Sequence, residues 1–72
     1  PEKSLDRTEK LERLQAAIDS LPEKYRFAFI LKEVQELSYQ EISKVLRISL
    51  GTVKSRVHRA KILLRGKLTG VL

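Results

Sequence analysis

Four side chains in the second half of the chain have the chemistry needed to bind a polyanion and to read it. Lys54 and Arg59 are cations with several N–H donors, Ser55 carries a hydroxyl, and His58 carries an imidazole. Such groups form hydrogen bonds with phosphate oxygens and with base edges in nucleic acids. At the period of an α-helix they project from the same side. The pattern therefore predicts a helix face that contacts DNA in the major groove.

The opposite side of the same segment is apolar. Its narrow stripe recurs at i, i+4, i+7 and i+11 and consists of Val53, Val57, Ala60 and Leu64. Gly51 joins the polar side, while Thr52 and Arg56 flank the stripe. Ser49, just before the first turn, can cap the helix. The segment is expected to bury one edge and to present the other to solvent.

A shorter helix with its own start signal precedes this segment. Ser38 and Glu41 stand at the spacing of a capping box, so a helix should begin at Tyr39. Its expected core side consists of Ile42, Val45 and Leu46. Two helices joined by the break at residues 47–49 predict a helix-turn-helix over residues 38–66.

Charge is spread unevenly along the chain. Residues 1–41 hold seven Lys/Arg and nine Asp/Glu, a net charge of −2, whereas residues 42–72 hold eight Lys/Arg and no acid, a net charge of +8. A cationic half without carboxylates repels itself unless it faces a polyanion, and nucleic acid is the commonest such partner. A basic face kept only for solubility is the alternative, and its place on a helix-turn-helix argues against it.

The first half predicts two more amphipathic helices, separated by the Leu21-Pro22 step. The first, to about residue 20, has a stripe of Leu11, Leu14, Ile18 and Leu21. The second, to about residue 36, has a stripe of Phe27, Ile30, Leu31, Val34 and Leu37. Tyr25 and Phe29 lie nearly opposite the second stripe, so either the first helix or a separate protein covers them. We favour the first helix.

The end of the last helix carries two further signals. Gly66 and Gly70 are expected to end it. Ile62 and Leu63 lie off its narrow stripe. They are expected to form a second seam against the first helix, with a partner site as the alternative.

A chain of 72 residues is expected to form one domain. The predicted fold class is all-α: a small four-helix domain at residues 8–68 that contains the helix-turn-helix, with a flexible lead at 1–7 and a tail at 69–72. Because the chain begins at Pro1 and contains no methionine, we expect a piece of a longer protein whose missing part lies upstream. No apolar run is long enough to span a membrane, so a soluble, cytoplasmic protein is expected.

Enzymatic sites lack support in the sequence. His58, the one histidine, has no carboxylate within a helical turn to orient it, which argues against a Ser-His-Asp arrangement. The run from Gly51 to Ser55 lacks the glycine spacing of a phosphate-binding loop. With no cysteine, the chain also lacks the usual ligands of a structural zinc site. We therefore expect no catalytic residue, no metal and no cofactor.

Three runs, in this order, resemble region 4 of bacterial sigma factors, especially of the extracytoplasmic-function group. They are Leu-Pro-Glu-Lys-Tyr-Arg at 21–26, Leu-Ser-Tyr-Gln-Glu-Ile at 37–42 and Gly-Thr-Val-Lys-Ser-Arg-Val-His-Arg-Ala at 51–60. The resemblance runs from about Leu14 to Leu68. Ser49-Leu50 stands where a Pro-Val pair is frequent, and Lys61 stands where arginine is common, so the preferred bases do not follow from the pattern.

The resemblance implies a four-helix domain that recognises the minus-35 element of promoter DNA and works without catalysis. It also implies a link to the RNA polymerase core through the beta-subunit flap, and frequent masking by an anti-sigma factor. The positions that match the family's major-groove contacts are Lys54, Ser55, His58 and Arg59. The residues expected to contact the DNA backbone are Tyr39, Lys44, Arg47, Thr52 and Arg56. Tyr25 and Phe29, if exposed, would dock a protein, and the domain is expected to be monomeric.

Two alternatives remain open at this point. The effector domain of LuxR-type response regulators also carries an Ile-Ser-x-x-Thr-Val-Lys run, although it lacks the Leu-Pro-Glu-Lys step and usually dimerises through its last helix. A helical protein-interaction module, whose basic face meets an acidic protein, is the alternative from a different functional class.

Overall fold

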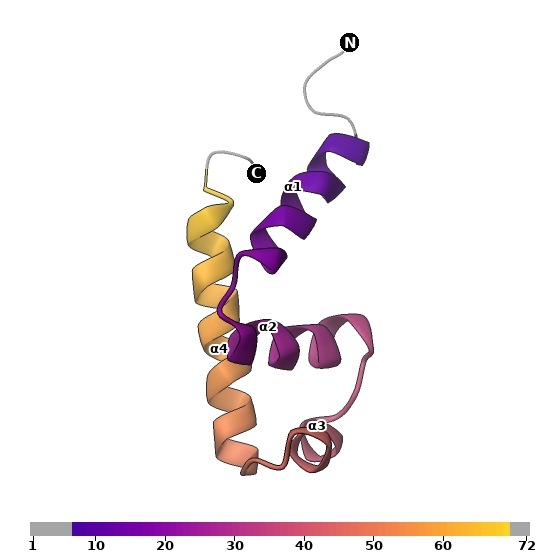
Figure 1. The fold of residues 1–72 in the computed structure, drawn as a ribbon, viewed down its shortest axis with the longest axis vertical. Coiled ribbons are helices and arrows are strands. Elements are labelled where there is room, and N and C mark those ends of the chain that lie inside the picture. The colour runs from indigo at the N-terminus through magenta and orange to yellow at the C-terminus, as the bar shows by residue number, and fades with distance from the viewer. Residues whose placement is uncertain (1–6, 70–72) are drawn as a thin grey trace.

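The computed structural model describes residues 7–69, which form an all-helical domain (Figure 1). The elements are α1 (Arg7–Asp19), α2 (Glu23–Phe29), the short π-helix η1 (Ile30–Val34), α3 (Tyr39–Leu46) and α4 (Leu50–Lys67). Since η1 continues α2 directly, this is the predicted four-helix domain, without a strand in the described residues. Apart from Arg7, which begins α1, the predicted lead lies outside the described residues, as does the predicted tail beyond Thr69.

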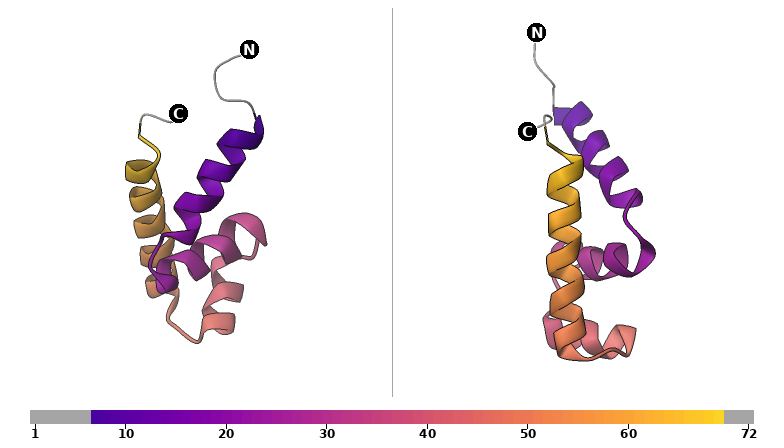
Figure 2. Two further views of the ribbon diagram at one scale, coloured as in Figure 1. Left: turned by 45° about the horizontal axis from the view of Figure 1, so that its top comes forward. Right: turned by 90° about the vertical axis from the view of Figure 1, so that its left-hand side faces the viewer.

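The long helix α4 contacts each of the other α-helices, α1, α2 and α3. The helix α2 crosses α4 near its middle and makes the most extensive helix-to-helix contact of the domain. α3 lies at the end where α4 begins, and α1 lies toward the end where α4 finishes (Figure 2). The α3–α4 pair, joined by a turn at residues 47–49, is the predicted helix-turn-helix.

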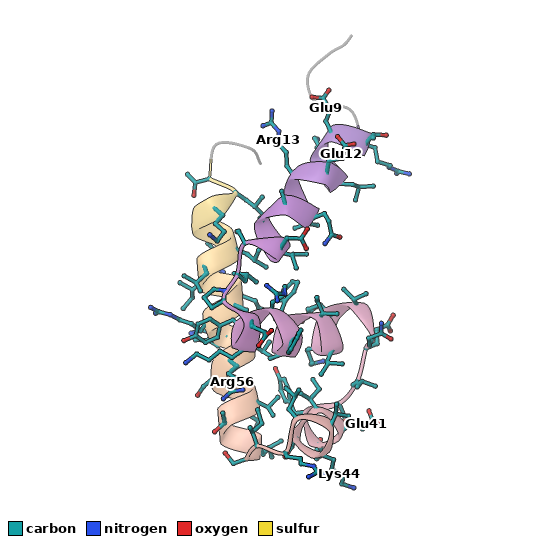
Figure 3. The ribbon with its side chains drawn as sticks, in the orientation of Figure 1. Glu9, Glu12, Arg13, Glu41, Lys44 and Arg56 are labelled. Carbon is teal, nitrogen blue, oxygen red and sulfur yellow. The ribbon has the colours of Figure 1, made fainter. Side chains whose placement is uncertain are left out.

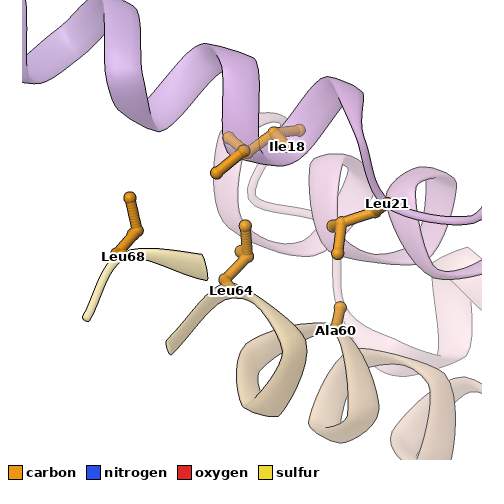
Figure 4. Packing of buried hydrophobic residues seen from close by; sticks show 6 residues of the cluster. Ile18, Leu21, Ala60, Leu64 and Leu68 are labelled. Atoms are coloured by element: carbon orange, nitrogen blue, oxygen red, sulfur yellow. The ribbon is translucent and has the colours of Figure 1, made fainter. Parts of the chain in front are cut away.

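Two apolar clusters hold these helices against α4. The first, shown in part in Figure 4, consists of Ala17, Ile18, Leu21, Ala60, Leu64 and Leu68. The second consists of Ala28, Ile42, Val53 and Val57. The stripe predicted for the last helix is buried along its whole length and contributes to both clusters, which confirms that prediction. This burial fixes which edge of α4 faces solvent.

The predicted stripe of α1 is only half right. Ile18 and Leu21 are buried, but Leu11 is 57% exposed and Leu14 is 37% exposed. Figure 1 shows the reason, since α1 slants away from α4 toward its own N-terminus. Periodicity identifies one side of a helix, but it does not reveal how far along the axis a neighbouring helix follows that side.

The predicted stripe of the second helix is also partly wrong. Phe27 is 45% exposed and Val34 is 58% exposed, whereas Ala28 is fully buried. A small side chain is needed where α2 crosses close to α4, so alanine takes the central position that the pattern gave to the bulkier Phe27. In η1 the hydrogen bonds skip one more residue than in an α-helix, as from Gln35 N–H to the Ile30 carbonyl at 3.0 Å. This rotates Val34 out of the expected register.

Three smaller expectations about the helix-turn-helix are corrected. Val45 is 59% exposed because α3 packs through Ile42 and Leu46 at the other edge of its stripe. Leu63 packs against the first cluster as expected, but Ile62 is 41% exposed. Gly66 does not end α4, which continues to Lys67, since a helix interior tolerates glycine at a modest cost.

Two non-glycine residues in the left-handed region end the middle helices. Glu36, with φ 58°, follows η1, and Arg47, with φ 58°, follows α3. At the first site the Leu37 N–H donates to the Leu31 carbonyl at 3.0 Å. This is the hydrogen bond that characterises a Schellman motif at the C-terminus of a helix. Both turns place the chain so that α3 and then α4 can pack on the second cluster. The sequence has no glycine at either position, so this signal was missing.

The predicted capping box at the start of α3 is confirmed. The Ser38 N–H donates to Glu41 Oε1 at 2.7 Å, and the Glu41 N–H donates to Ser38 Oγ at 3.0 Å. These hydrogen bonds to Ser38, with a smaller contribution from the charge of Lys44, lower the pKa of the Glu41 carboxyl below its ordinary value. The ionised form of Glu41 is therefore the form that stabilises α3.

The capping box is expected to make stability depend on acidic pH. A carboxyl whose pKa is lowered by folding stabilises the fold above its unfolded pKa, and this stabilisation is lost as the pH falls through the folded pKa. Glu41→Gln should therefore unfold at a lower urea concentration than the unmodified chain at neutral pH. Below pH 4.5, the ordinary pKa of this carboxyl, the difference in the free energy of unfolding between Glu41→Gln and the unmodified chain should become smaller. A gap that stays constant from neutral to acidic pH in urea titrations would contradict this prediction.

Candidate nucleic-acid interface

The first turn of α4 is fixed by the predicted cap. Ser49 Oγ accepts the Thr52 N–H at 3.1 Å, and the two hydroxyls of Ser49 and Thr52 lie 2.8 Å apart. On the other side of the turn, the Arg47 N–H donates to the Ser43 carbonyl, which closes α3. These hydrogen bonds fix the backbone at the end of α3 and at the start of α4.

The side chains predicted to read bases all lie on the solvent side of α4. Lys54, Ser55, His58 and Arg59 are exposed, while Val53 and Val57 on the opposite edge are buried. Thr52 and Arg56 are half-buried on the flanks, where the stripe predicted them. The helix therefore presents donors and cations outward over its first three turns. This matches the hydrogen-bonding requirements of base edges in a major groove.

The Tyr39 ring lies near cations from two other elements, η1 and α4. This ring, at the start of α3, has Lys54 Nζ of α4 at 5.9 Å from the centroid and Lys32 Nζ of η1 at 5.2 Å. Both distances lie within the range of a cation–π contact. Sequence reasoning singled out Tyr39 and Lys54 but missed Lys32, because only the fold brings η1 beside the helix-turn-helix.

An open hollow of about 640 Å³ extends the same face toward α2. Lys24 and Tyr25 line it from α2, and the α4 residues that line it are Thr52, Ser55, Arg56, His58, Arg59 and Ile62. None of these lining residues is a carboxylate. The positive surface of α4 therefore continues onto α2, and Lys24 is a second cation that sequence reasoning missed.

Two of the remaining predicted phosphate contacts, Lys44 and Arg47, lie toward the end of the domain where α4 begins. Lys44 on α3 is exposed and projects from this end, whereas Arg56 lies beside α4 (Figure 3). Arg47 is exposed in the turn between α3 and α4. Candidate cations thus lie on α2, η1, α3 and the turn as well as on α4, while Glu33 of η1 forms an ion pair with Lys61 of α4 at 3.3 Å.

Tyr25 and Phe29 follow the first of the two alternatives predicted for them. Both rings are half-buried and pack against the first cluster, which α1 and α4 build together. The aromatic ring with the larger free area is that of Phe27. Because both rings are half-buried, Tyr25 and Phe29 expose only part of their apolar surface for docking another protein.

Within residues 7–69, no helix is long and apolar enough to cross a membrane. The same residues contain no group of three or more His, Asp or Glu side chains placed to hold a metal ion.

Comparison with known proteins identifies the family to which this chain belongs. A family model described as sigma-70, region 4 matches residues 11–64, which include all of α2, η1 and α3 and most of α4. The chain belongs to the sigma-70 region 4 family. This membership replaces the LuxR-type alternative, and it agrees with the resemblance carried by the three sequence runs.

Curated relatives of this region 4 domain are sigma factors. The chain is 52% identical over 52 residues to ECF RNA polymerase sigma factor SigE of Mycolicibacterium smegmatis, covering 72% of this chain and 20% of the relative. It is 43% identical over 68 residues to ECF RNA polymerase sigma factor SigW of Bacillus subtilis, covering 94% and 36%. With RNA polymerase sigma factor YlaC of Bacillus subtilis it shares 41% over 69 residues, covering 96% and 40%. The chain thus spans a fifth to two fifths of these relatives.

Proposed function

We propose that this region 4 domain recognises the minus-35 element of promoter DNA and so directs RNA polymerase to begin transcription there. The observation that carries the proposal is the division of α4 into a buried apolar edge and an exposed edge of donors and cations. The domain would work by binding alone, as a monomer, in the bacterial cytoplasm where promoters are found.

Base reading is assigned to the outer side of α4. Arg59 and Lys54 can donate to the O6 and N7 acceptors of guanine, and Ser55 can donate to or accept from any base. His58 lies one turn after Lys54 and can contact a base edge or a phosphate. These contacts would set the sequence preference, since phosphate contacts carry no direct sequence information.

Orientation on the duplex is assigned to the residues around that helix. The proposed phosphate contacts are Lys24, Lys32, Tyr39, Lys44, Arg47, Thr52 and Arg56. Five of these seven are cations, so the logarithm of the binding constant should fall with the logarithm of salt concentration with a slope of about −4.5. A single module of this size binds modestly, and tethering to polymerase would raise the effective concentration at the promoter.

Contacts with protein partners are assigned to the apolar side chains left exposed on α1 and on the α2–η1 helix. These are Leu11, Leu14, Phe27 and Val34. Exposed apolar area of this kind is typical of surfaces that bind another protein. The proposed occupants are the beta-subunit flap of polymerase and, in competition with it, an anti-sigma factor. This placement replaces the one predicted at Tyr25 and Phe29.

Selection of bound duplexes from a random pool tests the proposed function. The 72-residue chain should enrich a short common motif, and titration with that motif should give the salt slope above. The same titration with a scrambled duplex should show weaker binding and a similar slope. Enrichment of no motif, or retention that does not depend on salt, would refute promoter recognition and favour a protein-interaction module.

A further inference from the structure

We propose that the ring of Tyr39 determines specificity indirectly, because its face holds the Lys54 ammonium in the position from which Lys54 reads a base. The inference rests on the proposed function, which assigns Lys54 to base reading, and it deepens that function by naming a positioning residue. The phosphate contact proposed for Tyr39 uses its hydroxyl, whereas this second role uses the face of the ring and acts through Lys54.

The Tyr39 ring is held from two sides. Tyr39 is the first residue of α3, directly after Ser38, where the capping box fixes the backbone. The ring is half-buried and packs against the second cluster. A tyrosine has only two rotatable side-chain bonds, so a ring anchored in this way has few other positions. It therefore provides a fixed surface beside α4.

The Lys54 side chain, by contrast, needs such a surface. It is exposed on α4, and a lysine stem in solvent adopts many rotamers. In the structure its ammonium lies 5.9 Å from the centroid of the Tyr39 ring, which is within the range of a cation–π contact. A contact that restrains the stem before DNA arrives removes part of the ordering cost of binding.

The restraint on Lys54 comes from a ring rather than from a carboxylate. α4 contains no acid, and the acids of η1 and α3 are engaged elsewhere: Glu33 pairs with Lys61 at 3.3 Å, and Glu41 belongs to the capping box. A carboxylate would accept the N–H donors that a base needs, whereas an ammonium against a ring face keeps most of its donors free. The free donors can then reach the O6 and N7 acceptors of a guanine.

Lys32 shares the same ring and so provides a matched control. Its ammonium lies 5.2 Å from the ring centroid, but its side chain is half-buried on η1 and is assigned to a phosphate. Loss of Lys32 should therefore weaken binding to every duplex by a similar factor. Loss of the Tyr39 ring should, in addition, change how strongly one base is preferred.

The test measures a discrimination ratio by fluorescence anisotropy. This ratio is the affinity for the selected duplex divided by the affinity for a duplex changed at the one base pair whose preference Lys54→Met relaxes. Tyr39→Leu keeps an apolar side chain without the ring and should lower the ratio about two- to fivefold, the effect of one exposed cation–π contact. Tyr39→Phe keeps the ring and should keep the ratio, as should Lys32→Met.

Fluorinated phenylalanines at position 39 separate the charge of the ring face from its shape. Fluorine withdraws electron density from the face, which weakens its attraction for a cation, while the ring keeps nearly the same size. The ratio should fall stepwise with the number of fluorine atoms. When the chain also carries Lys54→Met, no change at position 39 should alter the ratio, since the two groups act as a pair. Circular dichroism verifies that each variant keeps its helices.

The outcomes separate this inference from the proposed function. A ratio that does not respond to fluorination would overturn the role of the ring, even if Tyr39→Leu lowers the ratio through a shift of α3. A fall with Lys32→Met as large as with Tyr39→Leu would also overturn it. If Lys54→Met relaxes no base pair, Lys54 reads no base and the inference fails while promoter recognition stands. Enrichment of no motif by the unmodified chain would refute promoter recognition itself.

Discussion

Replacing Arg59 by alanine is expected to weaken binding to the selected duplex by about 10- to 100-fold, which corresponds to about 1–3 kcal/mol. Arg59 is exposed on the reading side of α4, and its guanidinium can form two hydrogen bonds to one guanine. Binding to a scrambled duplex should fall much less, because only the general attraction of one cation is lost there. Titrations of both duplexes at one salt concentration measure this difference.

Arg56→Ala is the matched control on the same helix. Arg56 is half-buried on the flank of α4 and is proposed to hold a phosphate. Its removal should weaken binding to both duplexes by the same factor and reduce the magnitude of the salt slope by about 0.9. If Arg59→Ala behaves in the same way as Arg56→Ala, then Arg59 reads no base and its assigned role is wrong.

Features that depend on a few neighbouring residues were predictable from the sequence. The capping box at Ser38 and the cap at Ser49 involve contacts over three residues, and both form as expected. The stripe of α4 was also predictable, because other helices cover that helix along nearly its whole length. Where a structural feature depends only on the geometry of one helix or its cap, the pattern of residue types is sufficient to predict that feature.

Features that depend on how helices cross were not predictable in the same way. Val45 and Phe27 fit their apolar patterns, yet both are largely exposed. Alanine at position 28 gives a weak apolar signal, yet it occupies the fully buried crossing of α2 and α4. Burial at a crossing is governed by the space between two helix axes, and single-helix periodicity does not contain that distance.

The same limit applies to the candidate interface. The residues of α4 could be assigned from one helical pattern, because they share one rigid element. Lys24 and Lys32 belong to other elements and reach the interface only after folding. No spacing along the chain connects them with Arg59 or Tyr39, so only the three-dimensional arrangement reveals that the positive face is wider than α4.

The small size of the second cluster makes the helix-turn-helix sensitive to a single core substitution. Ile42 is fully buried among Ala28, Val53 and Val57. Truncation of such a side chain to alanine typically costs about 2–5 kcal/mol, from lost transfer energy and from the cavity that remains. The total free energy of unfolding of a domain of this size exceeds the cost of this truncation by only a few kcal/mol. Ile42→Ala is therefore expected to lower the melting temperature by at least about 8 °C or to prevent folding.

Val45→Ala provides the contrast within the same helix. Val45 was expected to lie in the core from the sequence pattern, but it is 59% exposed. Its truncation should change the free energy of unfolding by less than about 0.5 kcal/mol. Thermal unfolding followed by circular dichroism would compare the two variants under one set of conditions.

A graded variant covers the case in which Ile42→Ala does not fold. Ile42→Val removes one methyl group and should cost about 0.5–1.5 kcal/mol, which leaves a folded domain with a measurably lower melting temperature. Because α3 supports the start of α4, Ile42→Val should also weaken DNA binding more than Val45→Ala does. Equal and small shifts in melting temperature for Ile42→Ala and Val45→Ala would show that α3 is not held by the cluster described above.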